Sequence, residues 1–310
     1  MNTQSNAVPE SRSDVQAISR TAPSRTRPLY WSIRRELWEN RSIYVVPLIV
    51  AGVELFGFLI SSTHLPERRR AVLLLDRAHQ RAAIELPYDL AAMMLILTAV
   101  IVGVFYCLDA LHGERRERSI LFWKSLPVSD RTTVLSKASI PLVVLPVVTF
   151  AIVIITQLMM LTTSTLILVT NGLAPATSSQ LPFVQNSLVL FYGLVAIALW
   201  HAPIYGWALL VSGWARRATF LWAVLPLLAI GIFEKITFNT SHFAALLKDR
   251  IFGFAANAFQ FQLSRGIALD SLAQITPGRY LSTPGLWIGL ILAALFIAAA
   301  IRLRRYRGPL

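Results

Sequence analysis

Long apolar runs alternate with short charged segments along most of the chain. Four of the runs contain no charged residue, and each is long enough to cross a bilayer core of about 30 Å as a helix. These runs are residues 90–108, 138–169, 181–215 and 280–301. Two further apolar segments, 42–60 and 218–233, complete the pattern, although the first contains Glu54 and the second is short. The pattern predicts an all-α integral membrane protein with six transmembrane helices.

The composition departs from that of soluble domains in the same direction. Hydrophobic residues make up 55% of the chain and charged residues 15%, against about 45–50% and about 25% in soluble domains. Cys107 is the single cysteine, so a disulfide within the chain is excluded. Its place inside a predicted helix favours a buried core thiol.

Three regions are expected along the chain. Residues 1–29 are rich in Ser, Thr, Pro and Arg, and they lack the apolar core of a cleavable signal peptide. This composition predicts a disordered cytoplasmic tail. Residues 30–303 form the six-helix domain, and residues 304–310 form a basic tail.

The net charge of +13 is distributed between the predicted membrane helices rather than gathered on one soluble face. A nucleic-acid-binding protein is therefore not expected. If the N-terminus is cytoplasmic, 19 of the 29 Lys and Arg residues fall on the cytoplasmic side, as the positive-inside rule requires. The basic run at 67–70 is the main exception. The expected topology is multi-pass with both termini in the cytoplasm.

An amphipathic segment, residues 30–41, precedes the first apolar run. The helical spacing places Tyr30, Ile33, Leu37 and Trp38 on one face and Arg34, Arg35, Glu36 and Glu39 on the other. This predicts a helix lying in the membrane interface. The alternative is an extension of the first transmembrane helix into the cytoplasm.

Prolines and polar stretches refine the remaining elements. The third membrane helix is expected to begin near Ile140, and the Ser/Thr-rich stretch from Leu161 to Leu181 predicts an outer loop. Pro203 predicts a kink in the fourth helix. The external segment 239–283 is long enough to carry structure, and its apolar spacing predicts an amphipathic or re-entrant helix before the last membrane span.

The segment between the second and third membrane helices, about 113–127, combines charge with aromatic residues. Glu114 and Arg118 have the favourable i,i+4 order for an ion pair, Pro127 ends the helix, and Ser129 can cap the next one. Charges beside exposed aromatics are typical of a protein interface. The alternative is a helix that skims the membrane without a partner.

The sequence resembles the permease subunit of type-2 ATP-binding cassette (ABC) exporters. The resemblance covers about residues 29–303, and its most specific part is FYCLDALHGERRERSILFWKSLPVSD at 105–130. RRELWENRSIYVVPLIVAG precedes this part, and LWHAPIYGWALLVSGWARR and TPGRYLSTPGLWIGL follow it. In that family six helices form half of a transporter, and the segment after the second helix is a coupling helix that fits a cleft on a separate ATPase.

The resemblance implies the partners and the contact residues. The chain lacks a Gly-Lys pair and hence a P-loop, so ATP and Mg²⁺ are expected on two copies of an ABC ATPase. A second permease copy, identical or different, would complete the substrate path in a bacterial cytoplasmic membrane. The candidate coupling residues are Glu114, Arg115, Arg116, Glu117, Arg118, Phe122, Trp123 and Lys124.

Other classes of membrane protein remain as alternatives. A secondary transporter or an assembly protein is the main one. An intramembrane enzyme is less well supported, because Ser212 has no histidine in the last helix to form a dyad, and the histidines lack zinc-protease spacing. No catalytic or metal-binding residue is predicted. Glu54, about 18 Å along its helix from Ser42, and His201 are candidates for a translocation path or for structural hydrogen bonds.

Overall fold

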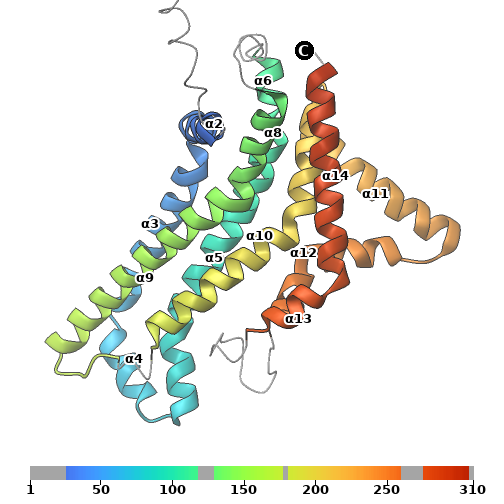
Figure 1. Ribbon diagram of the computed structural model, residues 1–310. Coiled ribbons are helices and arrows are strands. Elements are labelled where there is room, and N and C mark those ends of the chain that lie inside the picture. Colours follow the sequence, from blue (N-terminus) through green and yellow to red (C-terminus); the bar gives the residue numbers. More distant parts are fainter. Residues whose placement is uncertain (1–25, 118–128, 177–180, 260–274, 307–310) are drawn as a thin grey trace, which may run out of the picture.

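The structure is a computed structural model that describes residues 26–117, 129–176, 181–259 and 275–306 of the chain (Figure 1). The described residues form helices and no strand. The helices are α2 (Thr26–Glu39), α3 (Ser42–Ser62), α4 (Leu65–Val72), α5 (Arg77–Ala110), α6 (His112–Arg116), α8 (Asp130–Ser139), the π-helical turn η1 (Ile140–Val144), α9 (Leu145–Thr170), α10 (Phe183–Trp214), α11 (Thr219–Phe238), α12 (His242–Ala258), α13 (Pro277–Ser282) and α14 (Pro284–Tyr306).

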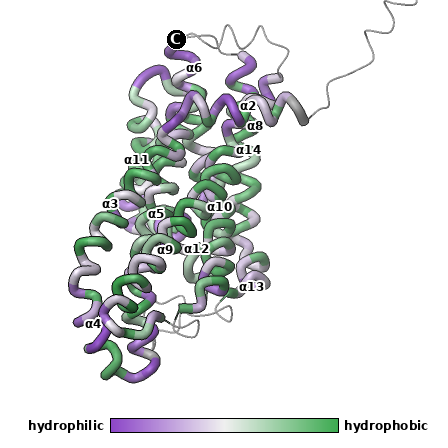
Figure 2. Tube along the Cα trace, turned by 90° about the vertical axis from the view of Figure 1, so that its left-hand side faces the viewer, coloured by the Kyte–Doolittle hydropathy of each residue, from purple (hydrophilic) through white to green (hydrophobic). Residues whose placement is uncertain are grey.

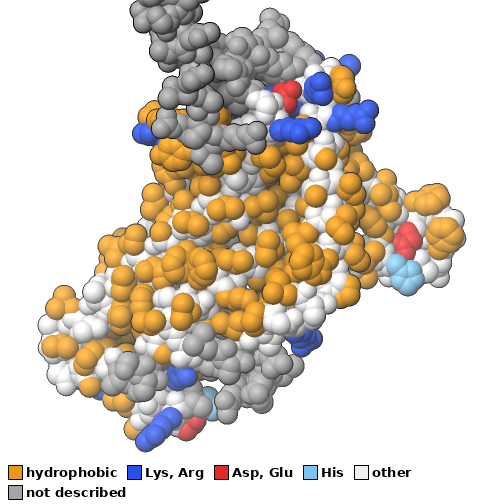
Figure 3. All heavy atoms as spheres, in the orientation of Figure 1, with side chains coloured by type: hydrophobic (Ala, Val, Ile, Leu, Met, Phe, Trp, Pro, Cys, Tyr) orange, Lys and Arg blue, Asp and Glu red, His pale blue; other side chains and the backbone are white. Residues whose placement is uncertain are grey.

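Among the described residues, six stretches are long and apolar enough to cross a membrane, which confirms the predicted all-α membrane protein. They are Ser42–Ser62, His79–Arg116, Asp130–Thr170, Phe183–Trp214, Thr219–Phe238 and Pro284–Tyr306. Apolar side chains cover the middle of the molecule, while hydrophilic residues gather at its two ends (Figures 2 and 3). One end carries α2, α6, α8 and the end of α14, and we call it the α6 end; the opposite end carries α4 and α13 (Figure 1).

The bundle is organised around α10. This helix packs on α14, α5 and α9, and α3 packs on α5 and α9 from the outside. Gly206 of α10 allows the closest approach, because a Cβ there would lie 3.2 Å from the carbonyl oxygen of Ala293 in α14. Small residues that let two backbones approach are a common basis of helix packing in membranes.

The third membrane helix differs from its expected limits at both ends. Ser129 caps α8 as predicted, since its side chain accepts from the Thr132 amide, and the helix then continues through η1 into α9. The outer loop expected after Leu161 is wrong, because α9 extends to Thr170. Hydroxyls such as Ser164 donate to carbonyls of their own helix, so the polar residues are accommodated without ending it.

The first helix, α2, also differs from its prediction. It begins at Thr26, so the expected tail is shorter than residues 1–29, and residues 1–25 lie outside the described part. Glu36, expected on the polar face, is fully buried. The exposed face instead carries aromatic residues, and Arg34 lies over the rings of Trp31 and Trp38 at 5.3 and 5.1 Å.

At the other terminus α14 extends to Tyr306, so the expected basic tail 304–310 is helical over its first residues. Residues 307–310 lie outside the described part. Arg304, expected in that tail, is buried against the bundle.

The helix predicted between residues 239 and 283 is present as α12, bounded by Ser241 and Phe259. It forms a hairpin with α11 that projects from the bundle and returns to α10 and α14 (Figure 1). Glu234 rigidifies the turn of the hairpin. Its carboxylate accepts from the amides of His242 and Phe243 at 2.7 and 2.8 Å, which satisfies two free donors at the start of α12.

Candidate functional site

A cluster of buried charges lies at the α6 end, where α2, α5, α6, α8 and α14 meet. Its members, which we call the charge hub, are Glu36, Glu114, Lys137 and Arg304. Each has an exposed fraction of 7% or less. Charged residues are rarely buried to this degree unless they are paired, and the contacts within the hub show how these four are paired.

Lys137 of α8 is the centre of the hub. Its Nζ lies 2.9 Å from Oε1 of Glu36 in α2 and 3.2 Å from Oε1 of Glu114 in α6. Tyr106 of α5 donates from its hydroxyl to Oε2 of Glu36 at 2.8 Å. One ammonium group therefore holds two carboxylates that are far apart in the sequence, and a phenol completes the set.

Arg304 extends the hub to the last helix. Its Nη2 donates to Oε2 of Glu114 at 3.1 Å, and its Nη1 contacts Asp130 of α8. Arg35 adds a third cation, with Nη2 at 2.8 Å from Glu36 and 3.4 Å from Glu114. Three carboxylates thus face three cations, so the buried group is close to neutral.

The pKa of Glu36 is lowered by the cations around it. Burial on its own would raise the pKa, but the charges of Lys137 and Arg35, together with the hydrogen bonds from Lys137 and Tyr106, outweigh it and lower the pKa below its ordinary value. Glu36 is therefore ionised at neutral pH. The hub is a set of true ion pairs rather than of neutral hydrogen-bonded groups.

The start of α6 is also fixed to the end of α10. The Oγ of Ser212, fully buried, accepts from the amides of Leu111 and His112, both at 2.9 Å. Arg115 donates to the carbonyl oxygens of Gly213 and Ala215 at 3.0 and 3.3 Å. Ser212 thus serves as a cap supplied by a neighbouring helix, a role that the sequence did not reveal.

The structure divides the predicted coupling residues into three groups. Glu114 and Arg115 are buried and engaged within the chain. Arg115 donates to a carbonyl of α10 instead of pointing outward as the sequence suggested. Arg116 and Glu117 are exposed, and Nη2 of Arg116 lies 3.6 Å from Oε1 of Glu117. The remaining candidates lie outside the described residues; they are Arg118, Phe122, Trp123 and Lys124. The predicted Glu114–Arg118 ion pair therefore also lies outside the described part.

The two candidate path residues lie within the bundle. Glu54 is half-buried on α3, and neither of its carboxyl oxygens has a hydrogen-bond partner among the described residues. His201 of α10 is buried, with Nδ1 2.9 Å from the carbonyl oxygen of Ile197. This contact fits the structural alternative for His201, and the path role of both residues stays a prediction.

A second cluster joins α12 to α10 and α14. The guanidinium group of Arg250 lies 4.7 Å from the ring centroid of Trp200 and donates to the carbonyl oxygens of Trp200 and Gly285. It occupies the space left by Gly289, where a Cβ would lie 2.6 Å from both terminal nitrogens. We call this contact the Arg250 clasp. In this contact the guanidinium group is stabilised by two carbonyl oxygens and an aromatic face.

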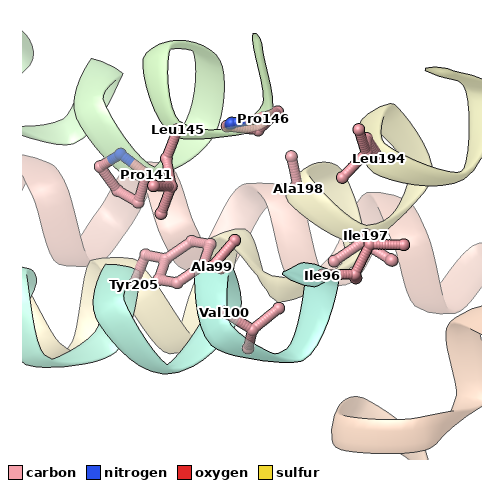
Figure 4. Close-up of a pocket in the computed structure, with 10 residues that line it drawn as sticks. All are labelled: Ile96, Ala99, Val100, Pro141, Leu145, Pro146, Leu194, Ile197, Ala198 and Tyr205. Carbon is pink, nitrogen blue, oxygen red and sulfur yellow. The ribbon is translucent and has the colours of Figure 1, made fainter. Parts of the chain in front are cut away.

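A small apolar cavity lies within the bundle. It has a volume of about 20 Å³ and lies between α5, η1, α9 and α10, and its walls are apolar apart from Tyr205 (Figure 4). This volume suits at most a single water molecule. Within the described residues there is also no group of three His, Cys, Asp or Glu side chains that could hold a metal ion, so the charge hub is the principal built site.

Comparison with known proteins gives one match. Residues 78–188, from α5 to the start of α10, match a family model described as a membrane protein of 12 TMs. No curated protein and no solved structure matches the chain. The match covers less than half of the chain and supports a multi-span membrane protein, a class that is compatible with a transporter.

Proposed function

We propose that this chain is the permease subunit of an ABC exporter, driven by a separate ATPase in a bacterial cytoplasmic membrane. The observation that carries the proposal is the way in which α6 is held. A segment that transmits movement from a partner must be joined rigidly to the membrane helices, because a loose loop would absorb the movement. The charge hub and the Ser212 cap supply such joints.

The joints reach most of the bundle. Glu114 of α6 connects through Lys137 to α8 and the third span, and through Arg304 to α14. Ser212 connects the start of α6 to α10. A push on α6 would therefore move the second, third, fourth and sixth spans together, which is what an ATP-driven change of access requires.

The division of residues within α6 fits the same role. Glu114 and Arg115 act as internal anchors, while Arg116 and Glu117 at the end of α6 are exposed and free to meet a partner. The aromatic residues Phe122 and Trp123 follow within the predicted coupling segment. Arg116 is thus proposed for contact with an acidic rim of the ATPase, and Trp123 for a pocket.

Two copies of the permease complete the proposed transporter. The six candidate spans within the described residues would give twelve in a dimer. The absence of a Gly-Lys pair supports ATP hydrolysis on a partner, and the purified chain is expected to show no ATPase activity of its own. ATPase activity that persists in this preparation after contaminants are removed would contradict the proposal.

The main test is purification of the full-length, tagged chain from its native membrane, followed by identification of stoichiometric partners. We expect a nucleotide-binding subunit with ATPase activity. Trp123→Ala should weaken its binding by on the order of 2 kcal/mol, about thirtyfold in affinity, and Arg116→Glu should also weaken it. Arg305→Glu is the matched control, because Arg305 is equally exposed at the α6 end but lies outside the segment. A missing ATPase, or equal recovery with all three variants, would contradict the proposal.

The orientation has a separate test. With the α6 end in the cytoplasm, we expect the α11–α12 turn to be accessible from the outside. A cysteine at His242 in a Cys107→Ser background should react with an impermeant maleimide in intact cells. Reaction only after the membrane is opened would show the opposite orientation. The α6 end would then lie outside the cytoplasm, where ATP is not available, and this would contradict the proposal.

A further inference from the structure

Glu54 lies on the face of α3 that packs against the rest of the chain. The buried residues of this helix include Ile43, Pro47, Ala51 and Ser62. Glu54 follows Ala51 by three positions and precedes the half-buried Phe58 by four, so it continues the same helical stripe. The stripe faces α5 and α9, on which α3 packs. The carboxyl group therefore points into the protein rather than into lipid.

No donor meets the carboxyl group there. Both oxygens are buried, and neither has a hydrogen-bond partner among the described residues. Ala51 belongs to a cluster with Leu95 of α5 and Ile152 of α9, and Phe58 belongs to the next one with Tyr88 and Met160. The half-buried side chain of Glu54 thus lies between two apolar clusters along the stripe.

Several polar groups on the neighbouring helices are engaged within the protein, whereas the buried Thr149 hydroxyl of α9 has no partner among the described residues. Tyr88 of α5 pairs its hydroxyl with Ser164, and Gln157 of α9 donates to the Tyr88 carbonyl. The acidic groups at this end of α5 are Glu85, which pairs with Arg81, and Asp89, which has a contact of its own. α9 carries no charged residue between Leu145 and Thr170. The basic residues of α5 include Arg81, which pairs with Glu85, and within the described residues no ion pair joins Glu54 to a cation.

We propose that Glu54 is a proton-binding site, held as the neutral carboxylic acid while α3 is packed on α5 and α9 and deprotonated when this packing opens. An ionised carboxylate without a donor is too costly in such surroundings. The cavity in Figure 4 is lined by no residue of α3, so Glu54 is not part of its wall.

Opening supplies the means of release. When water reaches the carboxyl group, the O–H bond breaks, the electron pair stays on the carboxylate, and the proton passes to water. Closing reverses the step. Movement of α3 is thereby linked to uptake and release of one proton. This linkage is independent of the proposed exporter function, since it follows from the packing of α3 alone.

The decisive measurement is the infrared difference between the wild-type chain and Glu54→Gln, both reconstituted in lipid bilayers at neutral pH. We expect the difference to contain the C=O stretching band of a protonated carboxyl group, with the usual small shift in D₂O. Glu85→Gln is the matched control, because Glu85 is a buried glutamate on a membrane helix that is ion-paired; its difference should contain carboxylate bands. Carboxylate bands for Glu54 would overturn the proposal.

A second arm tests the link to packing. Ala51→Leu places a larger side chain in the buried stripe and should loosen α3, whereas Val53→Leu changes an exposed position of the same helix. As the pH is raised, the acid band of Glu54 should disappear at least about one pH unit earlier with Ala51→Leu than with Val53→Leu. Identical titrations would show that protonation is independent of α3 packing. The Glu54→Gln and Glu85→Gln spectra remain decisive if Ala51→Leu does not assemble.

Discussion

The charge hub and Glu54 show two solutions to the same problem of burying a carboxyl group. In the hub, Glu36 and Glu114 share the ammonium of Lys137, and Glu114 also meets Arg304. In the middle of α3, the half-buried Glu54 lies between apolar clusters and has no donor among the described residues. The difference lies in position. The hub is at a hydrophilic end of the bundle where five elements meet, so cations can converge, whereas the described residues form no ion pair with Glu54.

The comparison separates two uses of buried charge. Fully paired charges hold elements in one arrangement, because separating them exposes each to a low-polarity environment. An unpaired carboxyl group holds nothing in place, yet it can change its protonation when its surroundings change. The hub therefore suits a fixed joint, and Glu54 suits a site that responds to movement.

The largest effect is expected when the hub loses its central cation. Lys137→Met leaves Glu36 and Glu114 buried with too little positive charge, which should reduce the free energy of unfolding by about 3–5 kcal/mol. Lys248→Met is the control, since Lys248 is exposed on α12. Denaturant unfolding in detergent measures both variants. Equal stability of the two would mean that the hub is not a structural joint.

The Arg250 clasp extends the comparison, because it holds a half-buried cation that forms no ion pair within the described residues. Gly289→Ala places a methyl group where the guanidinium lies and should displace it from the carbonyls of Trp200 and Gly285. We expect a loss of about 1–3 kcal/mol. Gly57→Ala is the matched control, because its Cβ would meet nothing within 4 Å. A similar unfolding midpoint for both variants would show that the clasp adds no stability.

Acidification should affect the hub in a defined direction. The pKa of Glu36 is lower in the folded protein than its ordinary value, so its contribution is present above about 4.5 and is lost as the pH falls through the folded pKa. Each unit of depression corresponds to about 1.4 kcal/mol. Glu36→Gln should therefore lose less stability than the wild type on acidification. Glu67→Gln, an exposed substitution on α4, should lose as much stability on acidification as the wild type. An unchanged acid response of Glu36→Gln would contradict the lowered pKa.

Local sequence patterns predicted the helices better than the site. The six spans follow from long uncharged runs, and Ser129 as a cap follows from its place before Asp130. The prediction that Glu36 lies on the exposed polar face of its helix was wrong, because the aromatic residues were assigned to the buried face. Yet Glu36 follows Ile33 by three positions, so the two share a helix face, and Ile33 packs against the core.

The pairing within the hub could not be predicted. Glu36 and Lys137 are about a hundred positions apart, and Glu114 and Arg304 are farther apart still. Only the packing of the helices brings them together. The same holds for Ser212, whose two donors come from the start of α6. For Glu54 the stripe on α3 was readable, but the lack of a donor depends on which residues α5 and α9 present.

The smallest effect on stability is expected from Glu54→Gln. The amide has nearly the shape and polarity of the neutral acid, so its free energy of unfolding at neutral pH should lie within about 0.5 kcal/mol of the wild type. Glu85→Gln removes the partner of Arg81 and should cost several times more. Because glutamine cannot release a proton, Glu54→Gln should nevertheless change transport or its pH dependence in reconstituted vesicles while assembly stays intact. A large loss of stability would mean that Glu54 is ionised and paired with a cation, and unchanged transport at every pH would leave the carboxyl group a structural one.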